Sequence, residues 1–125
     1  MNLNMKVLIV DDFSTMRRIV RNVLKQIGFT NMIEADNGKN ALKILKKENV
    51  DLILCDWNMP EMPGIELLKT LRSEDELKSI PFVMVTAEAQ KDNIIEAVKA
   101  GVSSYIVKPF TAETVSEKLN IIFKD

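Results

Sequence analysis

The amino-acid sequence predicts an α/β fold, a doubly wound parallel sheet of five strands with helices on both faces. Two observations lead to this fold class. Short apolar runs alternate along the 125 residues with segments whose apolar residues recur every three or four positions. Three of the runs, VLIV, LILC and FVMV, are apolar at every position, which is typical of strands covered on both sides.

Each apolar run is predicted to be a strand and each periodic segment a helix. The strands are expected at 6–10, 32–35, 52–55, 82–85 and 105–107, and the second of these runs is the weakest. The helices are expected at 14–28, 38–47, 64–72, 92–101 and 111–123. The chain therefore reads as a strand followed by a helix, five times over.

The helices are predicted from their apolar spacing and their end signals. The first carries apolar residues at positions 16, 19, 20, 23, 24 and 27, with Ser14 favoured as its N-cap and Gly28 as its end. The later helices repeat this spacing at Ala41, Leu42 and Leu45, at Ile65, Leu68 and Leu71, at Ile94, Ile95 and Val98, and at Val115, Leu119 and Ile122. Gly101 ends the fourth helix, and Thr111 opens the last one.

Composition excludes several classes of function. The 17 basic and 18 acidic residues give a net charge of −1, so nothing in the bulk charge suggests nucleic acid. The single cysteine, Cys55, allows no internal disulfide. No apolar run approaches the roughly 20 residues that span a bilayer, and the N-terminus lacks a signal segment. We expect one cytoplasmic domain over 1–125, monomeric and without an output domain.

Polar side chains gather where the predicted strands end. Asp11 and Asp12 follow the first strand, Asp56 the third, Thr86 the fourth and Lys108 the fifth. Ligands bind beyond the carboxyl ends of the strands in an open parallel sheet. All these ends lie on one edge, so three carboxylates, a hydroxyl and an ammonium are expected to converge there.

Three converging carboxylates require a cation. The chain has no histidine, and hard oxygen ligands favour Mg²⁺, or Mn²⁺, over zinc. An Asp carboxylate beside such a cation can accept a phosphoryl group. Lys108 and the Thr86 hydroxyl are suited to contact the phosphoryl oxygens. The four dispersed glycines form neither a P-loop nor a dinucleotide motif.

Four segments, VDDFSTMRRIVRN, DWNMPEMPGIELL, MVTAEA and YIVKPFTAET, closely resemble the CheY family of chemotaxis response regulators, the single-domain receivers of two-component systems. The resemblance covers about 6–123. It implies a flavodoxin-like (βα)5 fold with strand order 2-1-3-4-5. It also implies a signalling switch that catalyses only its own phosphotransfer and dephosphorylation, rather than an enzyme acting on other substrates.

The resemblance assigns roles to residues at the predicted site. Asp56 is expected to be the phosphoacceptor and also a metal ligand. Asp12 is expected to be the main Mg²⁺ carboxylate, with Asp11 positioning metal-bound water and the backbone carbonyl of Asn58 as a further ligand. The phosphoryl donor would be the phosphohistidine of a chemotaxis kinase, and small acyl phosphates would substitute for it.

The same resemblance predicts a conformational switch. Thr86 and Lys108 would bind the phosphoryl oxygens, and Tyr105 would move inward when Thr86 moves. The Lys108–Pro109 peptide is expected to be cis. Simpler interpretations are that Thr86 only caps a helix and that Tyr105 is an ordinary strand aromatic. Arg17 and Arg18 are expected on a solvated helix face.

The output surface is predicted on the last two helices and the strand between them. Its residues are Gln90, Lys91, Ile94, Val98, Tyr105, Val107, Lys118 and Ile121. Relatives that bind the flagellar motor switch tend to carry lysines at the positions of Gln90 and Ile121, and a small residue at that of Val98. Because the motor peptide is acidic in such systems, we expect weakened or redirected motor binding. A phosphatase is a further expected partner.

Two alternatives stay open beside motor control. One is a phosphate sink or a receiver with a different target, which needs the same site residues. The other is an Mg²⁺-dependent phosphohydrolase resembling the haloacid dehalogenases, but the segment DWN lacks the second acid of their motif. Pro63 stands where close relatives carry a small polar or acidic residue, and proline is expected to stiffen the loop after Asp56.

Overall fold

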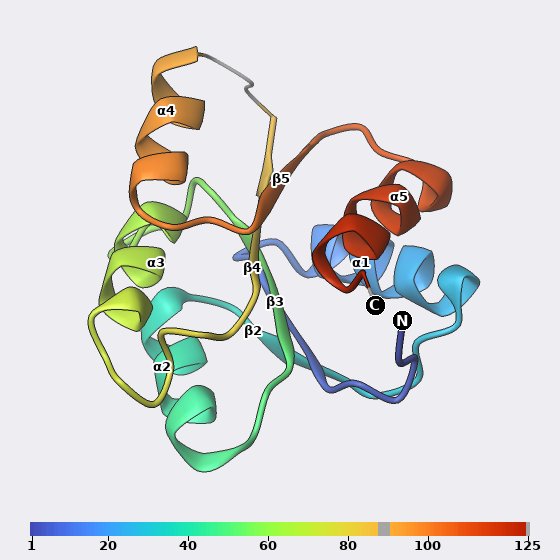
Figure 1. Ribbon diagram of the computed structural model, residues 1–125, viewed down its shortest axis with the longest axis horizontal. Helices are drawn as coiled ribbons and strands as arrows, with labels where there is room; N and C mark the ends of the chain where they lie inside the picture. Colours follow the sequence, from blue (N-terminus) through green and yellow to red (C-terminus); the bar gives the residue numbers. More distant parts are fainter. Residues whose placement is uncertain (88–90, 125) are drawn as a thin grey trace.

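The fold is a parallel sheet between two layers of helices, in a computed structural model that describes residues 1–87 and 91–124 (Figure 1). The strands are β1 Val7–Val10, β2 Met32–Ala35, β3 Leu52–Asp56, β4 Phe82–Thr86 and β5 Ser104–Val107. The helices are α1 Ser14–Ile27, α2 Gly38–Lys47, α3 Gly64–Arg72, α4 Lys91–Lys99 and α5 Ala112–Ile122. Within the described residues the sheet has five strands in the order β2-β1-β3-β4-β5, which confirms the predicted fold class.

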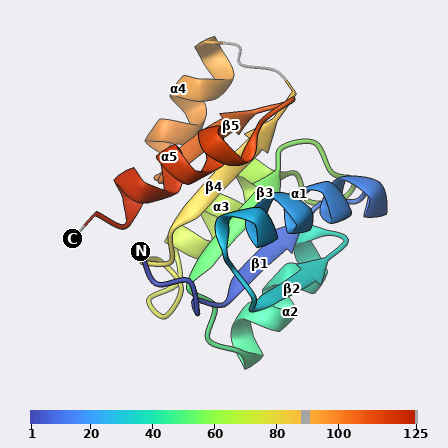
Figure 2. The same ribbon diagram turned by 90° about the vertical axis from the view of Figure 1, so that its right-hand side faces the viewer.

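The helices cover both faces of the sheet. Helices α2, α3 and α4 lie on one side, and α1 and α5 lie on the other (Figures 1 and 2). Alternate residues of β1 pack on opposite faces of the sheet. Leu8 and Val10 pack on the side of α2, α3 and α4, and Val7 and Ile9 pack on the side of α1 and α5. All four are at most 1% exposed, which explains why the run VLIV is apolar at every position.

Predicted and observed element ends agree within two residues, and β2, α2 and α3 match at both ends. Strands β3 and β4 extend one residue further than predicted, so Asp56 and Thr86 belong to the sheet. Asp56 lies opposite Val85, and the backbone carbonyl of Thr86 accepts a hydrogen bond from the Lys108 amide at 2.8 Å. The hydrogen-bonded ladder therefore fixes the backbone of both residues.

The predicted N-cap at Ser14 is wrong. The N-cap of α1 is Phe13, whose carbonyl accepts the first helical hydrogen bond from the Arg17 amide at 3.0 Å. Ser14 is already inside the helix, where its hydroxyl is not placed to cap the end. The other end signals are confirmed: Gly28 ends α1 with φ 126°, and Thr111 accepts a hydrogen bond from the Thr114 amide.

No helix in the described parts of the chain combines the length and apolar character that a membrane crossing requires. The longest helix, α1, has 14 residues and is amphipathic. Its buried residues, Val20 and Leu24, face the sheet.

Gly64 permits the chain to pass closely behind Asp56. Its amide donates to the Trp57 carbonyl at 2.8 Å, and a Cβ atom added at Gly64 would overlap the backbone carbonyl of Asp56. The obstacle is backbone that the sheet already holds, so it has little room to move. The first turn of α3 can approach the end of β3 only because residue 64 has no side chain.

We expect Gly64→Ala to lower the free energy of unfolding by about 1–3 kcal/mol, because the new methyl group forces the backbone of Asp56 or α3 to shift. Urea unfolding at equilibrium measures this change. Gly38→Ala is the matched control, since its Cβ atom would meet the flexible side chain of Met62 instead of backbone. Equal losses in the two variants would show that backbone overlap at Gly64 is unimportant.

Candidate functional site

The carboxyl edge of the sheet brings together the charged residues that the sequence predicts there. One carboxylate oxygen each from Asp11, Asp12 and Asp56 lies within 4.8 Å of the others. The ammonium of Lys108 is 3.0 Å from Asp56 Oδ1 and 3.7 Å from Asp11 Oδ2. Thr86, at the end of β4, is 5% exposed. The charged residues that follow β1, end β3 and follow β5 thus converge, and Thr86 ends the neighbouring strand β4.

Burial and like charge make the carboxylates of Asp11 and Asp56 costly to ionise. Burial raises the pKa of Asp56, and the hydrogen bond from Lys108 opposes that rise. Burial also raises the pKa of Asp11, against the hydrogen bond that its carboxylate accepts from the Phe13 amide at 2.9 Å. The two residues are 8% and 3% exposed. One ammonium against three carboxylates leaves an excess of negative charge.

The residues present fit a divalent cation with oxygen ligands. Asp12 Oδ1 is shielded from solvent and has no hydrogen-bond partner among the residues that the structure describes. An oxygen of this kind needs a partner, because an unpaired buried carboxylate oxygen is strongly unfavourable. The donor set consists of carboxylates, which is the chemistry that Mg²⁺ and Mn²⁺ select.

Two further predictions concern residues near this cluster. The Lys108–Pro109 peptide is cis, as predicted. Asn58 lies on the exposed loop between β3 and α3, and the role of its carbonyl as a ligand stays a prediction. Pro63 occupies the N-cap position of α3, where its ring offers no acceptor for the helix amides. The loop after Asp56 thus ends in a residue with a fixed φ of −58°.

Cys55 is a buried structural thiol beside Asp56. Burial raises the pKa of the thiol well above its usual value, and Sγ lies 3.3 Å from the Asp56 carbonyl oxygen, to which it donates. A thiol held protonated in the core is a poor nucleophile. The cysteine therefore adds a weak hydrogen bond to the strand end rather than a second reactive group.

Arg17 is a residue that sequence reasoning missed. It was expected on a solvated face, but its side chain is only 18% exposed, and Nη1 donates to the Asp11 carbonyl at 2.7 Å. Arg18 is exposed, as predicted. A signal was present in the sequence: an arginine in the first turn of a helix is opposed by the helix dipole, so its place there calls for a reason.

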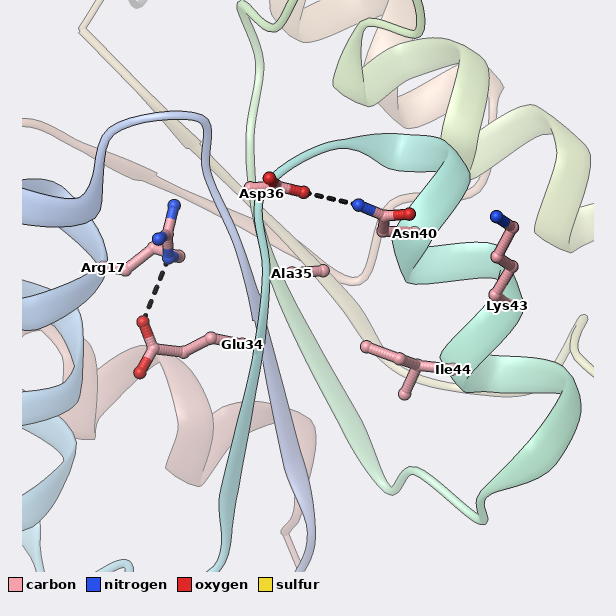
Figure 3. A pocket seen from close by; sticks show the side chains of 7 residues that line it. All are labelled: Arg17, Glu34, Ala35, Asp36, Asn40, Lys43 and Ile44. Atoms are coloured by element: carbon pink, nitrogen blue, oxygen red, sulfur yellow. Dashed lines mark hydrogen bonds and ion pairs between the residues drawn. The ribbon is translucent and has the colours of Figure 1, made fainter.

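A cavity of about 450 Å³ lies beside β2, next to this edge of the sheet. Figure 3 shows Arg17 from α1 facing Glu34 from β2 on one side, and Asp36 facing Asn40 on the other. The Asn40 side-chain amide donates to Asp36 at 2.6 Å. None of the clustered carboxylates lines this cavity, so it is a neighbour of the site rather than the site itself.

The predicted output surface is partly exposed and partly apolar. Val98 is 61% exposed and Ile121 is 74% exposed. Val107 is 37% exposed, and Lys91 is exposed, whereas Ile94 is partly buried. Gln90 lies outside the described residues.

Tyr105 on β5 is half-buried and packs against the core on the side of α2, α3 and α4. Lys118 on α5 places its ammonium 4.9 Å from the centre of the Tyr105 ring. This distance is within the range of a cation–π interaction. The aromatic ring therefore lies between the core and the surface, with a lysine over its outer face.

Comparison with known proteins identifies similar chains over nearly the whole length. The family described as the response regulator receiver domain matches residues 7–120. The chain is 60% identical over 124 residues to chemotaxis protein CheY-3 of Vibrio cholerae, covering 99% of this chain and 95% of the relative. It is 57% identical over 120 residues to chemotaxis protein CheY of Pseudomonas aeruginosa, covering 96% and 97% respectively.

Solved structures agree with these matches. Chemotaxis protein CheY4 of Vibrio cholerae superposes with a TM-score of 0.88 at 33% identity, covering 96% of this chain and 99% of the other. The receiver domain of the Francisella response regulator 1452 gives a TM-score of 0.86 at 33% identity, covering 97% and 98%. Sequence and structure comparisons thus point to one family.

The raised pKa of Asp56 predicts how stability depends on pH when metal is removed by a chelator. The folded state binds the Asp56 proton more tightly than the unfolded state, so this residue's contribution to stability falls as pH rises from about 3.8 through the raised value. Asp56→Asn should therefore gain stability relative to wild type between about pH 4 and pH 7. Urea unfolding across this range measures the difference; a growing advantage of wild type would contradict it.

Proposed function

The chain belongs to the response regulator receiver family, and on this premise we propose that Asp56 accepts a phosphoryl group in an Mg²⁺-dependent reaction. The observation that carries the proposal is the position of Lys108, whose ammonium lies 3.0 Å from Asp56 Oδ1 within a cluster of three carboxylates. A cation in hydrogen-bond contact with the reacting carboxylate is suited to receive the negative charge of a phosphoryl group. Membership of the family shows that the chain is a signalling switch of the receiver type. The roles of the individual residues are what we propose.

The proposed transfer is a displacement at phosphorus. A carboxylate oxygen of Asp56 attacks the phosphorus atom and forms an acyl phosphate bond. The bond from phosphorus to the donor breaks, and its electron pair stays with the imidazole nitrogen of a phosphohistidine or with the carboxylate of a small acyl phosphate. Positioning and charge stabilisation are the main contributions that the protein can make to such a reaction.

Asp11, Asp12 and Asp56 would hold the cation, with the Asn58 carbonyl as a further expected ligand. A bound divalent cation supplies charge neutralisation between the acceptor and the incoming phosphoryl oxygens. Lys108 would neutralise further negative charge, because its ammonium already lies within ion-pair distance of both Asp56 and Asp11. The Thr86 hydroxyl is proposed to bind a phosphoryl oxygen. Together these cations would offset the negative charge around the buried Asp56 carboxylate, so that it can react with the phosphoryl group.

Phosphorylation would act by shifting a conformational equilibrium. A phosphoryl group adds about 1.5 to 2 negative charges at Asp56, to which Thr86 and Lys108 respond. Movement of Thr86 would leave space for the Tyr105 ring, which is already half-buried, and Lys118 would lose its place over that ring. Such a switch requires two packings within a few kcal/mol of each other.

The proposed partners are a chemotaxis histidine kinase as phosphoryl donor and, on the output surface, the flagellar motor switch. A phosphatase and a cytoplasmic location belong to the same proposal. The exposed Val98 and Ile121 favour weakened or redirected motor binding. Ile121 stands where a lysine would pair with an acidic peptide, and Val98 stands where a small residue would leave it room. A phosphate sink would use the same Asp56 chemistry with no motor contact.

Trp57 reports on the proposed chemistry, since it follows Asp56 directly and is the only tryptophan. We expect its fluorescence to change on addition of Mg²⁺, and again on addition of a small acyl phosphate. Asp56→Asn should abolish the second change while retaining the fold, because the amide cannot accept the phosphoryl group. A donor-dependent change that persists in Asp56→Asn would place the acceptor elsewhere.

Ile121→Lys should strengthen binding of the activated protein to an acidic motor-switch peptide by about 1.4- to 5-fold, since an exposed ion pair contributes about 0.2–1 kcal/mol. Fluorescence titration at two salt concentrations measures this gain, which should shrink at high salt. Thr30→Lys, on an exposed loop at the opposite end of the strands, adds the same charge away from the output surface. If wild type already binds as tightly as a typical family member, the proposed weakening is refuted.

A further inference from the structure

Arg17 connects the acid pair to the neighbouring strand. Its Nη1 donates to the backbone carbonyl of Asp11 at 2.7 Å, and its Nε donates to Glu34 Oε1 at 3.0 Å. Arg17 lies in the first turn of α1, so its side chain reaches back over the turn that carries Asp11 and Asp12. Figure 3 shows the guanidinium directed toward Glu34 at the border of the cavity beside β2.

The helix itself gains nothing from an arginine at this position. The N-terminal end of a helix carries partial positive charge, which disfavours a cation in the first turn. No acidic residue stands in the first turn of α1 to compensate. Compensation comes instead from Glu34 on β2, which also accepts hydrogen bonds from Arg21 and is 2.8 Å from Arg21 Nη2. The arrangement therefore serves contacts outside the helix.

The carbonyl that Arg17 holds belongs to the peptide unit joining Asp11 to Asp12. That unit is planar, so fixing its oxygen also fixes the amide of Asp12 and the direction in which Asp12 leaves the turn. The other atoms of Asp11 are already held: its amide donates to the Ala35 carbonyl at 3.2 Å, and its Oδ1 accepts from the Phe13 amide at 2.9 Å. Arg17 completes the set of contacts that defines this turn.

We propose that Arg17 is a positioning residue that orients Asp12 for the divalent cation. Asp12 itself has an oxygen without a hydrogen-bond partner among the described residues, so its direction has to come from the backbone. Arg17 supplies that restraint through the Asp11 carbonyl, and Glu34 holds Arg17 in place. The inference rests on the proposed Mg²⁺ binding and adds a residue that the site assignments do not include.

Charge and positioning predict opposite effects for loss of Arg17. As a cation near three carboxylates, Arg17 repels an incoming divalent ion, so its removal should tighten Mg²⁺ binding if only charge matters. If Arg17 positions Asp12, its removal should weaken binding instead. Residues that orient a metal ligand typically change metal affinity by about 10-fold or more when they are replaced, so a loss of about 3- to 10-fold is expected here for a backbone contact.

The experiment measures Mg²⁺ affinity by Trp57 fluorescence in Arg17→Gln and Arg17→Lys, with urea unfolding to verify that each variant is folded. Lysine keeps the positive charge, but its single ammonium replaces the planar guanidinium that donates to the Asp11 carbonyl and to Glu34 at the same time. Both variants should bind Mg²⁺ about 3- to 10-fold more weakly. Arg21→Gln, which loses a Glu34 contact but no contact with Asp11, and the exposed Arg18→Gln should bind equally well or more tightly.

A second measurement uses the metal-free protein. Hydrogen exchange at the Phe13 amide, which donates to Asp11 Oδ1, should accelerate in both Arg17 variants and stay unchanged in Arg18→Gln. Unchanged exchange with equal or tighter Mg²⁺ binding would overturn the inference. If wild type does not bind Mg²⁺, the proposed function fails, and the Phe13 exchange still decides whether Arg17 fixes the turn. If Arg17→Gln does not fold, both Mg²⁺ affinity and Phe13 exchange are compared between wild type and Arg17→Lys.

Discussion

The structure depends on the close approach of three carboxylates, those of Asp11 and Asp56 buried and that of Asp12 more accessible, at one edge of a parallel sheet. Burial raises the pKa of both Asp11 and Asp56. In the described part of the chain, the side-chain cation that forms ion pairs with these two carboxylates is Lys108. The resulting excess of negative charge is unfavourable for the fold by itself and useful for binding cations and their phosphate ligands. The absent side chain at Gly64 lets α3 approach the end of β3, and Arg17 donates a hydrogen bond to the Asp11 carbonyl.

The parallel topology explains why so much of the site could be predicted from sequence. In an alternating α/β chain every strand must end at the same edge, so residues at 11, 56, 86 and 108 have to converge whatever the details of side-chain packing. Strand identity was equally secure, because runs such as VLIV are covered on both faces and carry no polar residue. The family resemblance added the strand order and the cis peptide before Pro109, which periodicity alone does not provide.

The parts that escaped prediction depend on contacts between distant segments. Ser14 is a good N-cap residue by type, but the N-cap lies one residue earlier, at Phe13, whose amide donates a hydrogen bond to the Asp11 carboxylate. Arg17 was expected to face solvent, since nothing in the sequence pairs it with Glu34 on a strand 17 positions away.

The central claim is that Asp56 is the residue that becomes phosphorylated. The most direct measurement treats the protein with Mg²⁺ and a small acyl phosphate, reduces it with borohydride, and locates the product by peptide mass spectrometry. Borohydride converts an aspartyl phosphate into homoserine, which marks the acceptor permanently. We expect homoserine at position 56 and nowhere else, and we expect it to be lost when Mg²⁺ is removed. Homoserine at position 11 or 12, or a complete absence of the product, would contradict it.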